Sequence, residues 1–213
     1  MSDFIHLASR SPRRRELLRQ LHVNHQVLMM REDPKRGADV DETPHEGEAA
    51  RDYTLRVATQ KATAGVRVLG LRKSALQRPV LAADTTIELE GAIIGKPRDA
   101  AHAAQILGKL SGRTHTVITA VALARGERTL THVSESTVSF DTPTCDTIQR
   151  YIATGEPMDK AGAYAIQNMD FHPVQMWNGC YCNVVGLPLA LTAALLHQSG
   201  YPLEGLVRPR QCS

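Results

Sequence analysis

Serines and arginines near the N-terminus form the first group that could do chemistry. Residues 9–15 read Ser-Arg-Ser-Pro-Arg-Arg-Arg. Ser11 is a favourable N-cap and Pro12 suits the first position of a helix, but three arginines in a first helical turn oppose the positive end of the helix dipole. Free N–H groups, hydroxyls and guanidinium groups together favour a multiply charged anion such as phosphate. The alternatives are a solvated basic helix start and a patch that contacts nucleic acid.

Asp84 is the second candidate, because it directly follows the apolar run of residues 79–83. A carboxylate at the end of a buried strand is costly unless it meets a cation or several donors, and ligand sites of α/β sheets lie at the carboxyl ends of strands. Asp84 with Thr85 is therefore a candidate Mg²⁺ ligand or general base, and a turn-capping aspartate is the alternative. Lys96, a short predicted hairpin further on, adds a cation that is either near Asp84 or simply solvated.

The third candidate is a segment of small residues, 159–167, that ends in Gln167. Small residues allow the backbone to approach a neighbour closely. The amide of Gln167 carries donor and acceptor groups that can bind the edge of a nucleobase. Packing of a helix start against a strand explains the same residues, so the segment by itself does not specify a ligand.

The elements that must position these residues alternate between strands and helices. Apolar runs and period-two alternation predict strands at residues 4–8, 26–30, 79–83, 87–90, 114–124 and 130–140. Apolar residues at helical spacing predict helices that begin at Pro12, cross residues 53–64, and cover residues 99–110, 148–155 and 188–198. Residues 31–48 have no period and read as a surface loop. A hairpin among strand–helix alternations predicts an α/β fold with a mixed sheet.

Composition excludes several classes of protein. With 42% hydrophobic and 22% charged residues among 213, the chain is an ordinary globular sequence and not a disordered one. Its longest apolar stretch, residues 184–196, is shorter than the roughly 18 residues that span a bilayer. The N-terminus has no secretory pattern, so we expect a cytoplasmic protein without membrane contact. A net charge of +3 and 4% aromatic residues disfavour a nucleic-acid partner.

Cysteines and histidines do not indicate a structural metal site. The four cysteines include Cys180 and Cys182 but no pair at zinc-finger spacing, and the nine histidines form no His-Glu-x-x-His pattern. Reduced, apolar cysteine side chains are the simpler interpretation. Metal chemistry is therefore expected to depend on carboxylates.

Several motifs, in this order along the chain, resemble one family. They are Leu-Ala-Ser-Arg-Ser-Pro-Arg-Arg at 7–14, Ala-Asp-Thr at 83–85, Gly-Lys-Pro at 95–97, Asp-Lys-Ala-Gly-Ala-Tyr at 159–164 and Asn-Val-Val-Gly-Leu-Pro-Leu at 183–189. Together they resemble the Maf family of nucleoside triphosphate pyrophosphatases, as a single domain over residues 1–213. The resemblance implies an elongated, inosine-triphosphatase-like α/β fold with flanking helices, two lobes around a nucleotide cleft, and a homodimer. It also implies hydrolysis of a nucleoside triphosphate to the monophosphate and pyrophosphate with Mg²⁺ or Mn²⁺.

The resemblance implies roles for individual residues as well. The aspartate that matches Asp84 is the catalytic base or a metal ligand. A second acidic metal ligand follows the second strand, where Glu32 and Asp33 are both candidates. Seven residues are expected to bind the substrate or set specificity: Ser9, Arg13, Arg14, Lys61, Thr85, Lys96 and Gln167.

The sequence around Gln167 indicates a branch of the family. Residues 162–167 read Gly-Ala-Tyr-Ala-Ile-Gln, which is similar to the branch that acts on dTTP and UTP, with CTP or modified pyrimidine triphosphates as further substrates. The branch that acts on 7-methyl-GTP typically carries a Phe-Lys-x-Glu type of sequence here. Residues 168–173 depart from the glycine-rich turn usual in the family, so the ranking among pyrimidines is open. The alternatives are a 7-methyl-GTP pyrophosphatase and a non-catalytic nucleotide-binding regulator of cell division.

Overall fold

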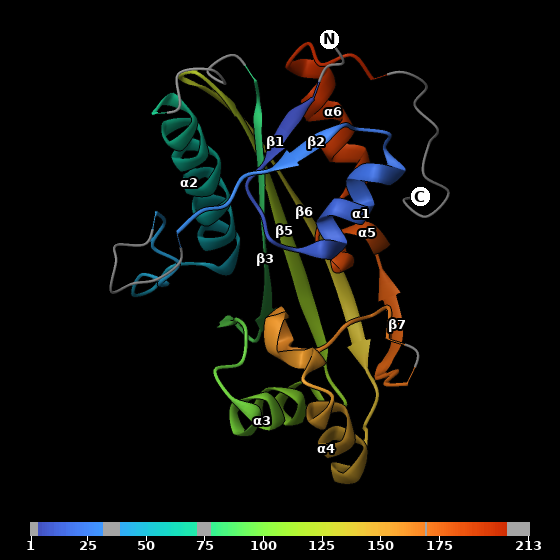
Figure 1. Cartoon of the computed structure of the whole chain (residues 1–213). Coiled ribbons are helices and arrows are strands. Elements are labelled where there is room, and N and C mark those ends of the chain that lie inside the picture. The colour runs from blue at the N-terminus through green and yellow to red at the C-terminus, as the bar shows by residue number, and fades with distance from the viewer. Residues whose placement is uncertain (1–3, 32–38, 72–77, 169, 204–213) are drawn as a thin grey trace.

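The backbone of the chain is organised around one mixed β-sheet, drawn in Figure 1. The computed structural model describes residues 4–31, 39–71, 78–168 and 170–203. Seven strands lie in the order β2-β1-β3-β5-β6-β7, with β4 paired to β3. The strands are β1 (Ile5–Leu7), β2 (His25–Val27), β3 (Val80–Leu89), β4 (Ala92–Ile94), β5 (Thr114–Arg125), β6 (Arg128–Phe140) and β7 (Val174–Asn178). Strand β1 pairs parallel with β2 and β3, and the other pairs are antiparallel, so the predicted α/β fold with a mixed sheet is confirmed.

The helices are α1 (Pro12–Gln20), α2 (Ala50–Gly70), α3 (Ala100–Leu110), α4 (Cys145–Ala153), α5 (Tyr181–Val185) and α6 (Leu189–Gln198), with 3₁₀ turns η2 (Glu156–Asp159) and η3 (Ala161–Ala163). Two of the helices, α1 and α3, begin where their capping residues predict. The Ser11 hydroxyl accepts from the backbone N–H of Arg14, and the Asp99 carboxylate accepts from that of His102. Each cap satisfies an otherwise unpaired N–H at a helix start. None of the helices in the described ranges is long and apolar enough to cross a membrane.

The two faces of the sheet are covered differently. Helix α2 packs alone against one face, over an alanine-rich core that includes Ala82 of β3 and Ala120 of β5. On the opposite face, α1, α5 and α6 cover Leu81 and Ala83 at one end. Helices α3 and α4 pack at the other end, with Ile87 and Leu89 of β3. The molecule is therefore elongated along the sheet, with apolar cores at both ends (Figure 1).

The structure corrects the predicted end of the central strand. Asp84 does not follow the strand but lies within β3, which continues to Leu89 because residues Val80 to Glu88 pair with β5. The strand that does end here is β1, whose last residue, Leu7, lies level with Leu81. Asp84 and Thr85 therefore lie just beyond the carboxyl end of β1.

Other elements differ from the sequence prediction as well. Strand β2 ends at Val27 instead of reaching residue 30, and the predicted strand at 87–90 is the end of β3. Strand β4 is the second strand of the short hairpin predicted before Lys96, whereas β7 and α5 have no counterpart in the prediction. Strand β7 lies at the sheet edge with four exposed residues in a row, so it carries no alternating pattern.

Candidate active site

A cleft opens in the middle of the sheet, between the two ends of the molecule. Its lining combines α1, α2, β3 and the 159–167 segment, which are far apart in the sequence. Six of the predicted substrate residues line it: Arg13, Arg14, Lys61, Thr85, Lys96 and Gln167. Asp84 lines it too, and Ser9 lines an adjoining cavity that shares Arg13, Arg14 and Lys61 with the cleft. The fold therefore brings these sequence-predicted residues together.

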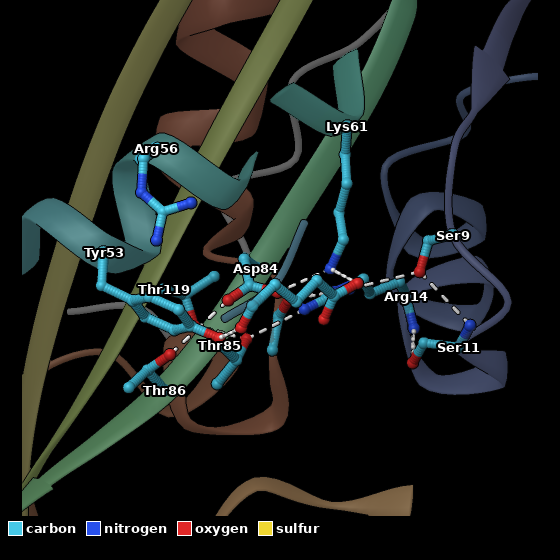
Figure 2. Close-up of polar contacts among 12 residues, drawn as sticks. Ser9, Ser11, Arg14, Tyr53, Arg56, Lys61, Asp84, Thr85, Thr86 and Thr119 are labelled. Carbon is cyan, nitrogen blue, oxygen red and sulfur yellow. Dashed lines mark hydrogen bonds and ion pairs between the residues drawn. The ribbon is translucent and has the colours of Figure 1, made fainter. Parts of the chain in front are cut away.

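Asp84 faces α2, where it meets a lysine (Figure 2). Lys61 Nζ lies 2.8 Å from Asp84 Oδ1, and the Thr86 hydroxyl donates to the other carboxylate oxygen at 3.5 Å. Both charged side chains are largely buried, with 11% of Asp84 and 17% of Lys61 exposed. Burial lowers the pKa of the Lys61 ammonium, but the negative charges of Asp84 and Glu42 outweigh burial and leave the pKa above its ordinary value. Lys61 is therefore a permanent cation in the cleft.

Glu42 is a site residue that the sequence interpretation missed. Its Oε1 lies 2.9 Å from Lys61 Nζ, so one ammonium joins Glu42 and Asp84, and Glu42 lines the adjoining cavity. In the sequence, Glu42 is one of several carboxylates in the aperiodic stretch 31–48, and nothing local distinguishes it. The two earlier candidates for an acidic partner, Glu32 and Asp33, lie outside the described residues.

Arg14 is held by three acceptors from three parts of the chain. Its Nε donates to the Gly186 carbonyl at 2.8 Å, and its Nη1 and Nη2 donate to the hydroxyls of Ser9 at 3.2 Å and Thr85 at 3.0 Å. Burial lowers the pKa of the guanidinium, while the negative charge of Asp84 opposes this shift. Five N–H donors belong to a guanidinium, so the side chain keeps donors for a ligand.

Thr85 belongs to a hydrogen-bond chain whose direction can be deduced. The Thr119 hydroxyl donates to the Asn183 carbonyl at 2.9 Å, so its only proton is committed. The contact between Thr85 and Thr119, also 2.9 Å, therefore has Thr85 as donor. The Thr85 oxygen accepts from Arg14 in turn. Donation runs from Arg14 through both threonines to the backbone of α5, which locks the guanidinium in place (Figure 2).

The far wall of the cleft consists of the 159–167 segment. Arg13 Nη1 lies 3.8 Å from Asp159 Oδ2, and this pair spans the cleft from α1. Lys160 is buried and bonds to Asp159 at 2.8 Å. Gln167 is exposed where it lines the cleft.

The small residues of this segment have the packing role that the sequence left open. Gly162 has a φ of +72°, a conformation that strains any residue with a side chain, and a Cβ atom there would clash with the Ile87 side chain of β3. Gly162 therefore packs directly against β3. Tyr164 packs edge-on against His115 and Phe140, and its hydroxyl lies 2.8 Å from His115 Nε2. The ring lines the cleft but is anchored in the core.

Comparisons with known proteins identify the family of the chain. A family model described as Maf-like protein matches residues 4–199. The chain belongs to the Maf family. A relative in Aromatoleum aromaticum named dTTP/UTP pyrophosphatase is 55% identical over 200 residues, which are 93% of this chain and 97% of the relative. Relatives of the same name in Nitrosomonas europaea and Shigella dysenteriae are 49% and 46% identical, over 92% and 90% of this chain and 94% and 91% of their own lengths.

The acidic groups of this Maf-family cleft suit a hard cation. In the described ranges, no group of three or more histidine, cysteine or acidic side chains could hold a metal. Asp84 and Glu42 instead offer carboxylate oxygens on either side of Lys61. Mg²⁺ is commonly bound by one or two carboxylates together with substrate phosphates. The donor set therefore fits Mg²⁺ or Mn²⁺ that arrives with a nucleotide.

Proposed function

We propose that this chain hydrolyses dTTP and UTP to the monophosphate and pyrophosphate. One observation carries the proposal: the Asp84–Lys61 pair lies in a cleft that also collects Arg13, Arg14 and Lys96. Cationic groups around a carboxylate suit a substrate with several phosphates. The relatives named dTTP/UTP pyrophosphatase, up to 55% identical, supply the substrate class.

The reaction follows from the groups in the cleft. Water attacks the α-phosphorus, a new P–O bond forms, and the bond to the bridging oxygen breaks as pyrophosphate leaves. Arg14 and Lys61, both held by fixed partners, stabilise the negative charge on the phosphates without reorganising. Arg13 leaves its ion pair with Asp159 to bind the substrate. Asp84 takes the proton of the attacking water or holds the cation.

The carboxylates Asp84 and Glu42 would hold Mg²⁺ or Mn²⁺. When bound, the ion supplies Lewis-acid stabilisation of phosphate oxygens. The two carboxylates carry a charge of −2 and Lys61 carries +1, so the trio has a net charge of −1. The two carboxylates therefore keep an excess negative charge that a bound divalent cation would offset.

The pyrimidine would bind along the 159–167 segment. Gln167 is exposed in the cleft and offers a donor and an acceptor to the edge of the base. Thr85 takes part through its acceptor oxygen, because its proton is committed to Thr119. Ser9 supports the phosphate side through Arg14. A homodimer of single-domain chains stays a prediction from the resemblance, and a cytoplasmic location stays a prediction from the sequence.

Phosphate release in the presence of inorganic pyrophosphatase tests the proposal. The panel contains dTTP, UTP, CTP, 7-methyl-GTP and ITP, with Mg²⁺ or Mn²⁺. We expect dTTP and UTP to lead, and Asp84→Asn to lower turnover by at least about 100-fold while the protein stays folded. A preference for 7-methyl-GTP would overturn the assigned substrate. Near-normal turnover in Asp84→Asn would exclude both roles of Asp84, and no turnover with any nucleotide would favour a binding protein.

A further inference from the structure

Residues 39–48 have no regular secondary structure and contact α2 through Tyr53 and Arg56. The segment is nevertheless anchored at both ends. At one end, Asp39 accepts from the backbone N–H and the guanidinium of Arg31 at 2.8 to 3.1 Å. At the other end, Glu48 pairs with Arg56 of α2. Glu42 lies between the two anchors. Because a loop of this kind is ordinarily mobile, its fixed course needs a cause.

Arg56 makes four hydrogen bonds to this segment. Its Nε and Nη2 each lie 2.7 Å from an oxygen of Glu48, which is a bidentate pair. Nη2 also donates to the Thr43 carbonyl at 3.0 Å, and Nη1 donates to the Asp41 carbonyl at 3.3 Å. Arg56 thus holds the backbone on both sides of Glu42. The pair is largely buried, with 18% of Arg56 and 11% of Glu48 exposed, so solvent screens it weakly.

Tyr53 holds Glu42 itself. One helical turn before Arg56, its hydroxyl donates to the Glu42 carbonyl at 3.0 Å, and the Arg56 guanidinium lies over its ring. Figure 2 shows Tyr53 and Lys61 extending from α2 toward Asp84. Tyr53, Arg56 and Lys61 of α2 therefore connect the segment with the cleft.

We propose that Arg56, Glu48 and Tyr53 form a clamp that positions the Glu42 carboxylate beside Asp84. The three are positioning residues, because the hydrogen bonds described above hold the backbone of the segment and its Glu48 end, and not the Glu42 carboxylate itself. The catalytic consequence rests on the proposed function, in which Glu42 and Asp84 hold a divalent cation. Such a clamp matters more for Glu42 than for Asp84. The sheet already fixes Asp84 in β3, whereas Glu42 lies in a segment without secondary structure.

Hydrogen exchange tests the clamp without any catalysis. We compare Arg56→Gln and Tyr53→Phe with Arg51→Gln, a control on the same helix that removes an exposed ion pair to Glu135. Arg56→Gln should speed amide exchange across residues 39–48 and leave exchange in β3 and β5 unchanged. Unchanged exchange across residues 39–48 in Arg56→Gln would overturn the clamp. Faster exchange throughout the molecule would also overturn it, because the role would then be general stability.

Dependence on Mg²⁺ tests the effect on the cleft. Supporting partners of metal ligands typically change metal affinity or activity by 10–100-fold. Arg56→Gln should therefore raise the Mg²⁺ concentration for half-maximal dTTP hydrolysis by about tenfold. Loss of the single Tyr53 hydrogen bond should raise it by about threefold. A wild-type Mg²⁺ dependence in Arg56→Gln, like that of Arg51→Gln, would overturn the positioning role.

A double-mutant cycle shows whether the effect passes through Glu42. If it does, Arg56→Gln adds little once Glu42→Gln has removed the carboxylate. Independent, multiplying losses would overturn the proposal. Should wild-type protein turn over none of the triphosphates, the proposed function fails, while the exchange experiment still decides whether the clamp orders the segment.

Discussion

Asp84 and Thr85 are neighbours in β3, yet they face opposite sides of the sheet and belong to different kinds of structure. Asp84 points toward α2 into a charged group with Lys61 and Glu42. Thr85 points toward α1 and α5, where neutral hydroxyls pass hydrogen bonds from Arg14 to a backbone carbonyl. Asp84, Glu42 and Lys61 carry a net charge of −1, which a bound cation would offset. On the Thr85 side, hydrogen bonds within the protein fix the threonines in place, while Arg14 keeps further N–H donors for a ligand.

This contrast follows from the period of a strand. Successive side chains alternate between the faces of a sheet, so one step along β3 moves from one environment to the other. The same alternation places Thr119 and His115 of β5 on the neutral face. We therefore expect substitution of the charged groups in the cleft to affect turnover most, and substitution of Thr119 or His115 to affect stability most.

The largest effect should come from removing the cation on the α2 face. Lys61→Met leaves Asp84 and Glu42 without their shared partner and removes a charge from the phosphate site. We expect turnover of dTTP to fall by about 100-fold, measured as phosphate release. Lys109→Met, at an exposed lysine of α3, is the matched control. Turnover within about twofold of wild type in Lys61→Met would break the contrast between the faces.

A smaller effect, on stability, should come from His115. Burial lowers the pKa of His115 to about 4, against about 6.5 in an unfolded chain. The unfolded state therefore binds more protons between these values. The stability contributed by the neutral ring is complete above pH 6.5 and is lost as the pH falls toward 4. Between pH 7 and pH 5 this loss is about 2 kcal/mol.

The variant His115→Gln should lack this pH dependence. Urea unfolding of both proteins at pH 7 and pH 5 gives the difference in free energy of unfolding. We expect wild type to lose about 2 kcal/mol more than the variant over this interval. Equal losses in the two proteins would show that His115 is not held neutral by the core.

The smallest effect should come from breaking the hydroxyl chain. Thr119→Val keeps the shape of the side chain but removes the hydroxyl that donates to the Asn183 carbonyl and accepts from Thr85. We expect about 1 to 2 kcal/mol less stability, or a melting temperature lower by roughly 2–8 °C. Turnover should fall only severalfold. Thr131→Val, at an exposed position of β6, is the control. If Thr119→Val lost more turnover than Lys61→Met, the contrast between the two faces would be reversed.

Much of the fold was predictable because its signals are local. Ser11 with Pro12 and Asp99 mark helix starts by capping chemistry, which needs only a few neighbouring residues. The apolar run before Asp84 indicates a buried strand for the same reason. The end of that strand was predicted wrongly, because pairing with β5 and not the local sequence carries β3 on to Leu89.

At the site, the resemblance to the Maf family predicted more residues than hydrophobic patterns and local motifs did. The motifs that resemble the Maf family named the residues that the structure gathers in one cleft. Glu42 was not predicted, because only its contact with Lys61 of another element distinguishes it and its own stretch of sequence has no hydrophobic period. The hydrogen-bonding roles of Thr119 and Asn183 were not predicted, because a hydroxyl and an amide in apolar stretches look like ordinary core residues.

What the sequence by itself determined is the set of local choices: where helices begin, which runs are buried, and which residues are charged enough to bind phosphate. The tertiary structure alone decided which charges meet. Lys61 lies between Asp84 and Glu42 only because α2 packs against β3 and the segment 39–48 is tied back to α2. Contacts of that kind depend on packing between distant elements, and no local propensity encodes them.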